Sequence, residues 1–207
     1  MSAASTFAVF LASVPLTFGA TRGLHERWRA RWRLRDYPDL DDARENGRVS
    51  ATGVVRALDE TLTAPLSGRP CVAYRTRVWS SSQPTGVGYA YRETIQLRPF
   101  VIDLGDEEII IDGERAMFGI PPQKLPRDPE REASFLARHA LAHGRARFSE
   151  VVLELGAHVT VGGTLVLVPR DEPAMEELGF RDPPPPSQRI VGNRERPLLL
   201  VALDDRS

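Results

Sequence analysis

Residues 100–111 have the sequence FVIDLGDEEIII, two short apolar runs separated by a polar turn. The runs are rich in β-branched side chains, which is typical of strands, and Gly105-Asp106 between them is suited to a tight turn. Asp112-Gly113 follows directly and offers a second hairpin turn. We therefore expect a β-meander in this part of the chain.

The same kind of short run recurs on both sides of this meander. Strands are expected at Val49–Ala57, Cys71–Trp79, Tyr89–Leu97, Glu150–Leu155, His158–Val161, Thr164–Val168 and Leu198–Leu203, with Gly162-Gly163 as a turn. One helix is expected to begin at Asp128, an N-cap residue followed by Pro129, and to end near His143. The pattern predicts a mainly β fold, a small barrel or an OB-like meander, with one internal helix and an N-terminal membrane helix.

Composition excludes several classes of protein. A chain of 207 residues is long enough for one compact core. The 27 basic residues nearly balance the 28 acidic ones, which argues against a highly charged nucleic-acid binder. The single cysteine, Cys71, excludes an internal disulfide and a four-cysteine zinc site. Lys124 is the only lysine among the 27 basic residues, and this preference for arginine is typical of a GC-rich genome and predicts a bacterial source.

Residues 2–21 carry no charged side chain and are mostly apolar. A helix of that length would cover roughly 30 Å, the thickness of the hydrocarbon layer of a bilayer. Pro15 interrupts its hydrogen bonding, although membrane helices tolerate proline. We expect a transmembrane anchor here, and a cleaved signal peptide or a soluble core helix are the alternatives.

A strongly basic segment follows the apolar run. Between residues 22 and 35 six arginines face one acid, Glu26, for a net charge of +5, so the positive-inside rule places the rest of the chain on the cytoplasmic side of a single-pass membrane protein. On a helix Trp28 and Trp32 share one face. Together with Arg27 and Arg31 they are expected to lie at the membrane interface. The alternative is a solvated basic helix whose tryptophans pack on the domain. Nucleic acid is not an expected partner, because four aspartates follow at once.

Several segments of the chain, taken in order, resemble the GIDE domain. This β-rich module occurs in mitochondrial membrane-anchored ubiquitin ligases and in bacterial and archaeal membrane proteins. The matching stretches are 62–68 with 71–75, 99–103, 130–136 with Ser149-Glu150, and 156–163. The resemblance covers roughly residues 53–203 and implies a domain held beside a membrane.

The resemblance does not imply ubiquitin-ligase activity for this chain. Eukaryotic members with this activity also possess a RING domain, whose two zinc ions need about eight Cys and His ligands. This chain contains one Cys and four His, so it cannot supply that ligand set. We therefore expect a relative of the prokaryotic type without the RING domain and without enzymatic activity.

Candidate catalytic and metal sites are weak. His139 and His143 are four residues apart on the expected helix, a spacing that zinc-binding helices use, and Glu132 is a third candidate ligand. The HExxH pattern is missing, and arginines crowd the region. A Cys71–His158 nucleophile pair is a further alternative. No phosphate or dinucleotide motif occurs, and neither a metal nor a cofactor is expected.

The function expected from the sequence is non-enzymatic interaction with protein or lipid at a membrane surface. The organisation is an anchor (2–21), a basic and then acidic juxtamembrane segment (22–47) and a GIDE-like β domain (48–203). The proposed binding residues are charged side chains beside core strands, which must be exposed or paired: Arg75, Arg77, Asp103 and Glu150. The alternatives are a metal-dependent enzyme or metal-binding protein using His139 and His143, and an OB-like ligand-binding barrel with Tyr89 and Tyr91 as stacking platforms.

Overall fold

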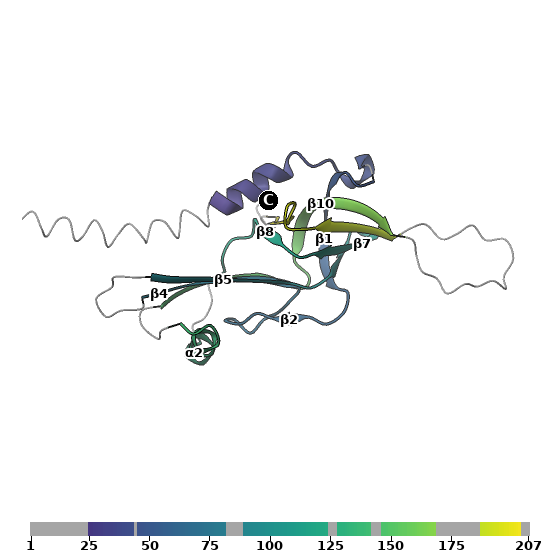
Figure 1. The fold of residues 1–207 in the computed structure, drawn as a ribbon. Helices are drawn as coiled ribbons and strands as arrows, with labels where there is room; N and C mark the ends of the chain where they lie inside the picture. Colours follow the sequence, from purple (N-terminus) through teal and green to yellow (C-terminus); the bar gives the residue numbers. More distant parts are fainter. Residues whose placement is uncertain are drawn as a thin grey trace, which may run out of the picture.

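The fold was analysed in a computed structural model (Figure 1), which describes residues 25–43, 45–81, 89–123, 128–141, 146–168 and 187–203. A helix covers residues 25–34 and is followed by a short 3-10 helix, Leu40–Asp42. The remaining elements are β1 (Arg48–Ala57), β2 (Leu62–Thr63), β3 (Pro70–Cys71), β4 (Ala73–Ser81), β5 (Tyr89–Leu97), β6 (Phe100–Asp103), β7 (Glu108–Gly113), β8 (Ala116–Phe118), α2 (Pro129–Arg138), β9 (Ala146–Leu153), β10 (His158–Val168), β11 (Ser187–Gly192) and β12 (Leu198–Ala202).

Five strands close into a barrel in the order β1-β6-β7-β11-β10, with β10 pairing back onto β1. All of these pairings are antiparallel except that of β7 with β11. The barrel interior is apolar, with Phe100, Ile102, Ile111 and Val161 among its fully buried side chains. β12 pairs with β10, and β8 pairs with β12, beside the closed ring. The expected mainly β fold with a small barrel is therefore confirmed.

The remaining long strands form a separate three-stranded side sheet in the order β5-β4-β9. Its inner end is continuous with the barrel core, because Ala73, Val151 and Leu153 belong to the same cluster of buried side chains. Helix α2 packs on one face of the sheet near its outer end, where Phe135 and Leu136 contact Val78 and Phe148. The side sheet thus extends from the barrel as a separate arm (Figure 1).

The helix of residues 25–34, which we call the N-terminal helix, lies on the barrel and on the other face of the side sheet. Its Leu34 packs against Gly162 of β10, where a β-carbon would lie 2.6 Å from the leucine side chain. Ala30 is fully buried and lies beside Gly119. Glycine at these two contacts lets the helix approach the barrel closely. Within the described residues, no helix is long and apolar enough to span a bilayer, and the expected anchor at 2–21 lies outside them.

Three local predictions are wrong. β10 runs straight through Gly162-Gly163 instead of turning there, because the glycines make room for neighbouring side chains within a continuous strand. β8 does not return along β7 after Asp112-Gly113 but pairs with β12. Helix α2 begins at the predicted Asp128 cap and ends at Arg138, several residues short of His143.

Candidate functional site

The outward face of the N-terminal helix carries a pair of exposed tryptophans. Trp28 and Trp32 are 66% and 56% exposed, and their rings stack with centroids 6.3 Å apart and planes 7° apart. Their spacing of four residues places them on one side of the helix, as the sequence predicts. A cluster of large apolar side chains exposed on a protein surface marks an interaction site more often than a single exposed apolar residue does.

Arginines flank this tryptophan pair and differ in exposure. Arg29, Arg33 and Arg35 are exposed, whereas Arg27 and Arg31 are half-buried at the flank of the helix. The difference follows from the rotation of the helix, which turns Glu26, Ala30 and Leu34 toward the domain. We call the set Trp28, Arg29, Trp32, Arg33 and Arg35 the Trp-Arg face, of which Arg33 also contacts the domain through Nη1, 3.7 Å from Sδ of Met117 on β8.

Glu26 fixes that rotation by ion pairs with the side sheet. One oxygen of its carboxylate, Oε2, accepts a hydrogen bond from Nη1 of Arg75 at 2.8 Å and another from Nη2 of Arg77. Arg77 also donates from Nε to Glu93 at 2.7 Å. We call these four residues the Glu26 clasp. Two positive and two negative side chains balance within it.

The two arginines of the clasp are buried as well as paired. Each arginine side chain is only 6% exposed, because the N-terminal helix covers it. Burial and the neighbouring Arg77 lower the pKa of Arg75. Burial also acts to lower the pKa of Arg77, but its hydrogen bonds to Glu26 and Glu93 outweigh that effect and raise it. Arg75 also lies over the ring of Phe118, 5.3 Å from the centroid. Internal partners therefore occupy both predicted binding residues.

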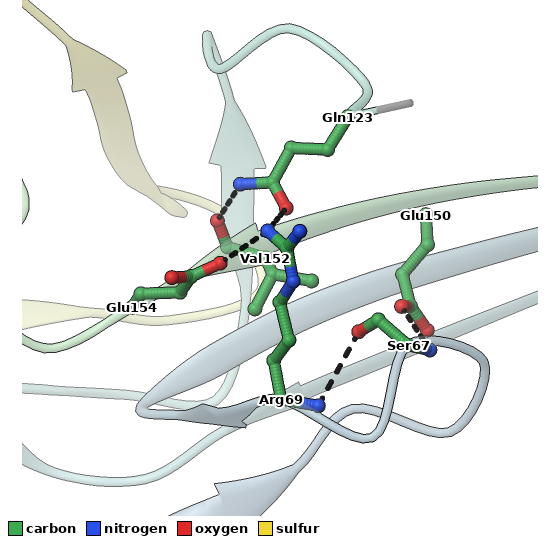
Figure 2. Close-up of polar contacts among 6 residues, drawn as sticks. All are labelled: Ser67, Arg69, Gln123, Glu150, Val152 and Glu154. Atoms are coloured by element: carbon green, nitrogen blue, oxygen red, sulfur yellow. Dashed lines mark hydrogen bonds and ion pairs between the residues drawn. The ribbon is translucent and has the colours of Figure 1, made fainter. Parts of the chain in front are cut away.

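Glu150, the third predicted binding residue, is completely buried on the opposite face of the side sheet. Its carboxylate accepts hydrogen bonds from the backbone N–H groups of Leu66 and Ser67, both at 2.9 Å, and from the Thr76 hydroxyl at 3.0 Å. Figure 2 shows the side chain pointing at the loop that contains Ser67. The geometry is that of a structural anchor for residues 64–68.

A second polar cluster closes the other end of the same loop. Nη1 of Arg69 donates to Oε1 of Gln123 at 2.9 Å and to Oε1 of Glu154 at 2.7 Å (Figure 2). The amide nitrogen of Gln123 donates in turn to the carbonyl oxygen of Val152. These contacts join the β2–β3 hairpin to β9, and the sequence offered no signal for them because the partners are far apart in the chain.

Asp103, the fourth predicted binding residue, lies at the end of β6 and pairs with Arg56 of β1. Its other oxygen accepts a hydrogen bond from the backbone N–H of Gly105 at 2.8 Å, which shapes the turn before β7. All four predicted binding residues thus have ion-pair or hydrogen-bond partners within the protein; the sequence predicted that they would be either exposed or paired. Among these four, the structure brings only Arg75 and Arg77 together.

The structure describes only part of the candidate catalytic and metal-binding set. His139 caps the end of α2 and its ring contacts that of Phe135 at a tilt of 50°, while His143 lies outside the described residues. Burial, with Arg92 and Arg138 nearby, lowers the pKa of His139. Burial, followed by Glu150 and Glu154, raises the pKa of the Cys71 thiol to about 12, which disfavours the thiolate that a nucleophile requires. Among the described residues no group of three or more His, Cys, Asp and Glu side chains could hold a metal ion.

Tyr91, one of the two predicted stacking platforms, is 41% exposed on β5. Because β5 belongs to the side sheet, Tyr91 does not lie on the barrel. The centroid of its ring lies 5.5 Å from that of Trp79.

Compared with protein-family models, with curated proteins and with solved structures, the chain matches none of them.

Proposed function

We propose that this protein is a membrane-anchored, non-enzymatic β domain that binds protein partners or lipid at the cytoplasmic face of the membrane. One observation supports the proposal most strongly. The N-terminal helix packs on the domain through Glu26, and the stacked Trp28 and Trp32 point away from the domain. The helix's described residues, 25–34, follow the apolar run 2–21 after only three residues. The GIDE resemblance inferred from the sequence of residues 53–203 implies the same location.

The chemistry of the Trp-Arg face suits the boundary between a bilayer and water. Indole rings lie preferentially at the headgroup level, where one part of the ring is apolar and another donates a hydrogen bond. Guanidinium groups bind phosphate oxygens, and basic segments beside a membrane gain about 1 kcal/mol per charge on an anionic surface. Because Glu26 is held inside the clasp, it does not offset the exposed Arg29, Arg33 and Arg35.

The barrel supports a second candidate function, an OB-like domain that binds a ligand. Numbered by themselves, its strands follow the order 1-2-3-5-4-1 with strands 3 and 5 parallel, the arrangement of an OB-like barrel. The strands β6 and β7 carry Glu108 and Asp112 beside the Asp103–Arg56 ion pair, so their side chains offer no excess of positive charge for nucleic-acid phosphate.

Vesicle flotation of the full chain tests the first proposal. Leu11→Arg places a charge in the apolar run, which costs about 3 kcal/mol at the centre of a membrane helix and separates surface binding from insertion. We expect this variant to float with vesicles that contain phosphatidylglycerol, to be released by high salt, and not to float with phosphatidylcholine alone.

The Trp-Arg face is then tested in the same background. Trp28→Ser with Trp32→Ser should abolish flotation, whereas Leu155→Ser, at a 43% exposed leucine on the distant β9–β10 turn, should leave it unchanged. Equal flotation of both variants would show that this face does not bind the membrane. Retention of the unmodified chain by vesicles of either composition, resistant to salt, is the result expected of an inserted anchor.

A further inference from the structure

The outer end of the side sheet carries a row of aromatic and basic side chains on the face turned toward the N-terminal helix. Arg147 of β9 lies opposite Trp79 of β4, and Trp79 lies opposite Tyr91 of β5, so side-chain alternation places all three on one face. The Trp79 and Tyr91 rings are in contact, and Arg147 is exposed. We call these three residues the outer row.

The outer row lies one step beyond the Glu26 clasp. Trp79 follows Arg77 by two residues on the same face of β4, a rise of about 6.6 Å along the strand. The row just inside it contains Ser149, Arg77 and Glu93, and its arginine is the one that holds Glu26. The aromatic side chains therefore lie just beyond the arginine that holds Glu26.

The N-terminal helix and strand β4 both extend outward from the barrel on the same side, although their chain directions are opposite. Leu34, at the end of the helix, contacts the barrel at Gly162, and Glu26, eight residues earlier, reaches the side sheet. Ala73, at the start of β4, belongs to the barrel core, and Trp79 lies near the strand's outer end. The first described residues of the helix and the outer end of β4 therefore lie on the same side of the molecule (Figure 1).

The membrane must be close to this side if residues 2–21 are an anchor. Only residues 22–24 separate that run from His25, and three residues span at most about 10 Å. The headgroup layer on each side of the hydrocarbon core is itself roughly 5–8 Å deep. A row about 6.6 Å beyond the clasp is therefore within reach of that layer.

We infer that the outer row, Arg147, Trp79 and Tyr91, is a second membrane contact that lies in the headgroup layer of an anionic bilayer. The inference rests on the proposed membrane anchoring. The residue types are those of a membrane interface, two amphipathic aromatic rings beside a cation that binds phosphate. The row faces the helix, whereas Trp28 and Trp32 face away from the domain. Contacts on both sides of the helix hold the domain in one orientation relative to the membrane.

The chain's tryptophans provide a direct test, because Trp28, Trp32 and Trp79 are its only three. Trp28→Phe with Trp32→Phe leaves Trp79 as the sole fluorophore, and Trp28→Phe with Trp79→Phe leaves Trp32. Each full-length variant is reconstituted into phosphatidylglycerol-containing vesicles, with or without lipids brominated near the headgroup end of their acyl chains. We expect brominated lipid to reduce the emission of Trp79 at least twofold. We also expect acrylamide in the water to quench Trp79 less in the vesicle-bound protein than in unfolded protein without vesicles.

The outcomes separate this inference from the proposed function. Quenching of Trp32 but not of Trp79 by brominated lipid overturns the second contact and leaves the anchored domain standing. Failure of every variant to associate with the vesicles overturns both. A Trp79 emission shift that depends on protein concentration and not on lipid would show that a second copy covers the row, which also overturns the inference. Arg147→Glu should reduce lipid quenching of Trp79 without changing that of Trp32.

Discussion

Glu26 of the N-terminal helix forms an ion pair with Arg77 in the middle of strand β4, although 51 residues separate them in the chain. The same carboxylate oxygen binds Arg75, so one acidic side chain compensates two buried arginines together with Glu93. This contact determines which face of the helix meets the domain. The orientation of Trp28 and Trp32, on which the proposed membrane contact depends, is therefore set by a clasp on the opposite side of the helix.

Removing the clasp carboxylate should destabilise the fold. Glu26→Gln leaves Arg75 and Arg77 with less compensation in a buried position, and breaking a fully buried ion pair costs about 3–5 kcal/mol. The Glu26 side chain is 29% exposed, so we expect a smaller loss of about 2 kcal/mol in the free energy of unfolding, measured with urea. Glu114→Gln, which weakens the exposed Glu114–Arg194 pair, should have no measurable effect. Equal stability of the two variants would argue against the clasp.

The close approach of helix and barrel at Gly162 provides a second test. In Gly162→Ala the added methyl group meets Leu34 at 2.6 Å and Tyr37 at 3.2 Å, so the helix must shift away. We expect a loss of about 1–2 kcal/mol in the free energy of unfolding and faster hydrogen exchange in residues 25–34. Leu34→Ala in the same chain should recover part of this loss, and strict additivity of the two substitutions would contradict the contact.

Glu150 should behave as a buried anchor and not as a binding residue. In Glu150→Gln an NH2 group replaces one carboxylate oxygen and cannot accept the hydrogen bond from Leu66 or Ser67. We expect the free energy of unfolding to fall by about 2 kcal/mol. Glu154→Gln, at a side chain that is 40% exposed, serves as the matched control and should cost less. A fully stable Glu150→Gln variant would contradict the anchor.

Cys71 should make stability sensitive to alkaline pH. Its thiol keeps its proton in the folded protein up to about pH 12, whereas the unfolded thiol ionises near its usual value of 9.0. Because this folded-state pKa is raised, the thiol contribution is complete below pH 9 and is lost as the pH rises toward 12. Relative to Cys71→Ala, the wild-type chain should lose about 1 kcal/mol of unfolding free energy between pH 8 and pH 10.

The alkaline effect has an independent readout. Iodoacetamide at pH 8 should modify Cys71 only after the protein is unfolded, because the side chain is fully buried. Rapid alkylation of the folded protein would show that the thiol is accessible and would remove the basis for the expected pH dependence.

Local patterns predicted many of the strands correctly. Alternation in 89–97 coincides with β5, the two apolar runs around Gly105 form the antiparallel pair β6 and β7, and Asp128 caps α2 through hydrogen bonds to two backbone N–H groups. Contacts between distant segments were not predictable in this way. Arg75 is buried by a helix whose contacting residue, Glu26, lies 49 residues away in the chain. No local pattern in β4 indicates whether a helix or solvent covers this face.

The same limit applies to the candidate site. A spacing of four residues was enough to place Trp28 and Trp32 together, because that relationship belongs to any helix. How far each neighbouring arginine is exposed depends on how the helix packs on the domain: Arg29 and Arg33 are exposed, and Arg27 and Arg31 are half-buried. The outer row joins three strands and becomes visible only once their register is known.

Fractionation of cells that express the full chain with a C-terminal fluorescent protein tests the central claim most directly. The account predicts that fluorescence sediments with the membranes, remains there after high-salt and alkaline washes, and is lost from the washed pellet in Leu11→Arg. Fluorescence recovered in the soluble fraction of cells with the unmodified chain would contradict the membrane-anchored domain. Activity of a C-terminal phosphatase that works only outside the cytoplasm would contradict the cytoplasmic placement.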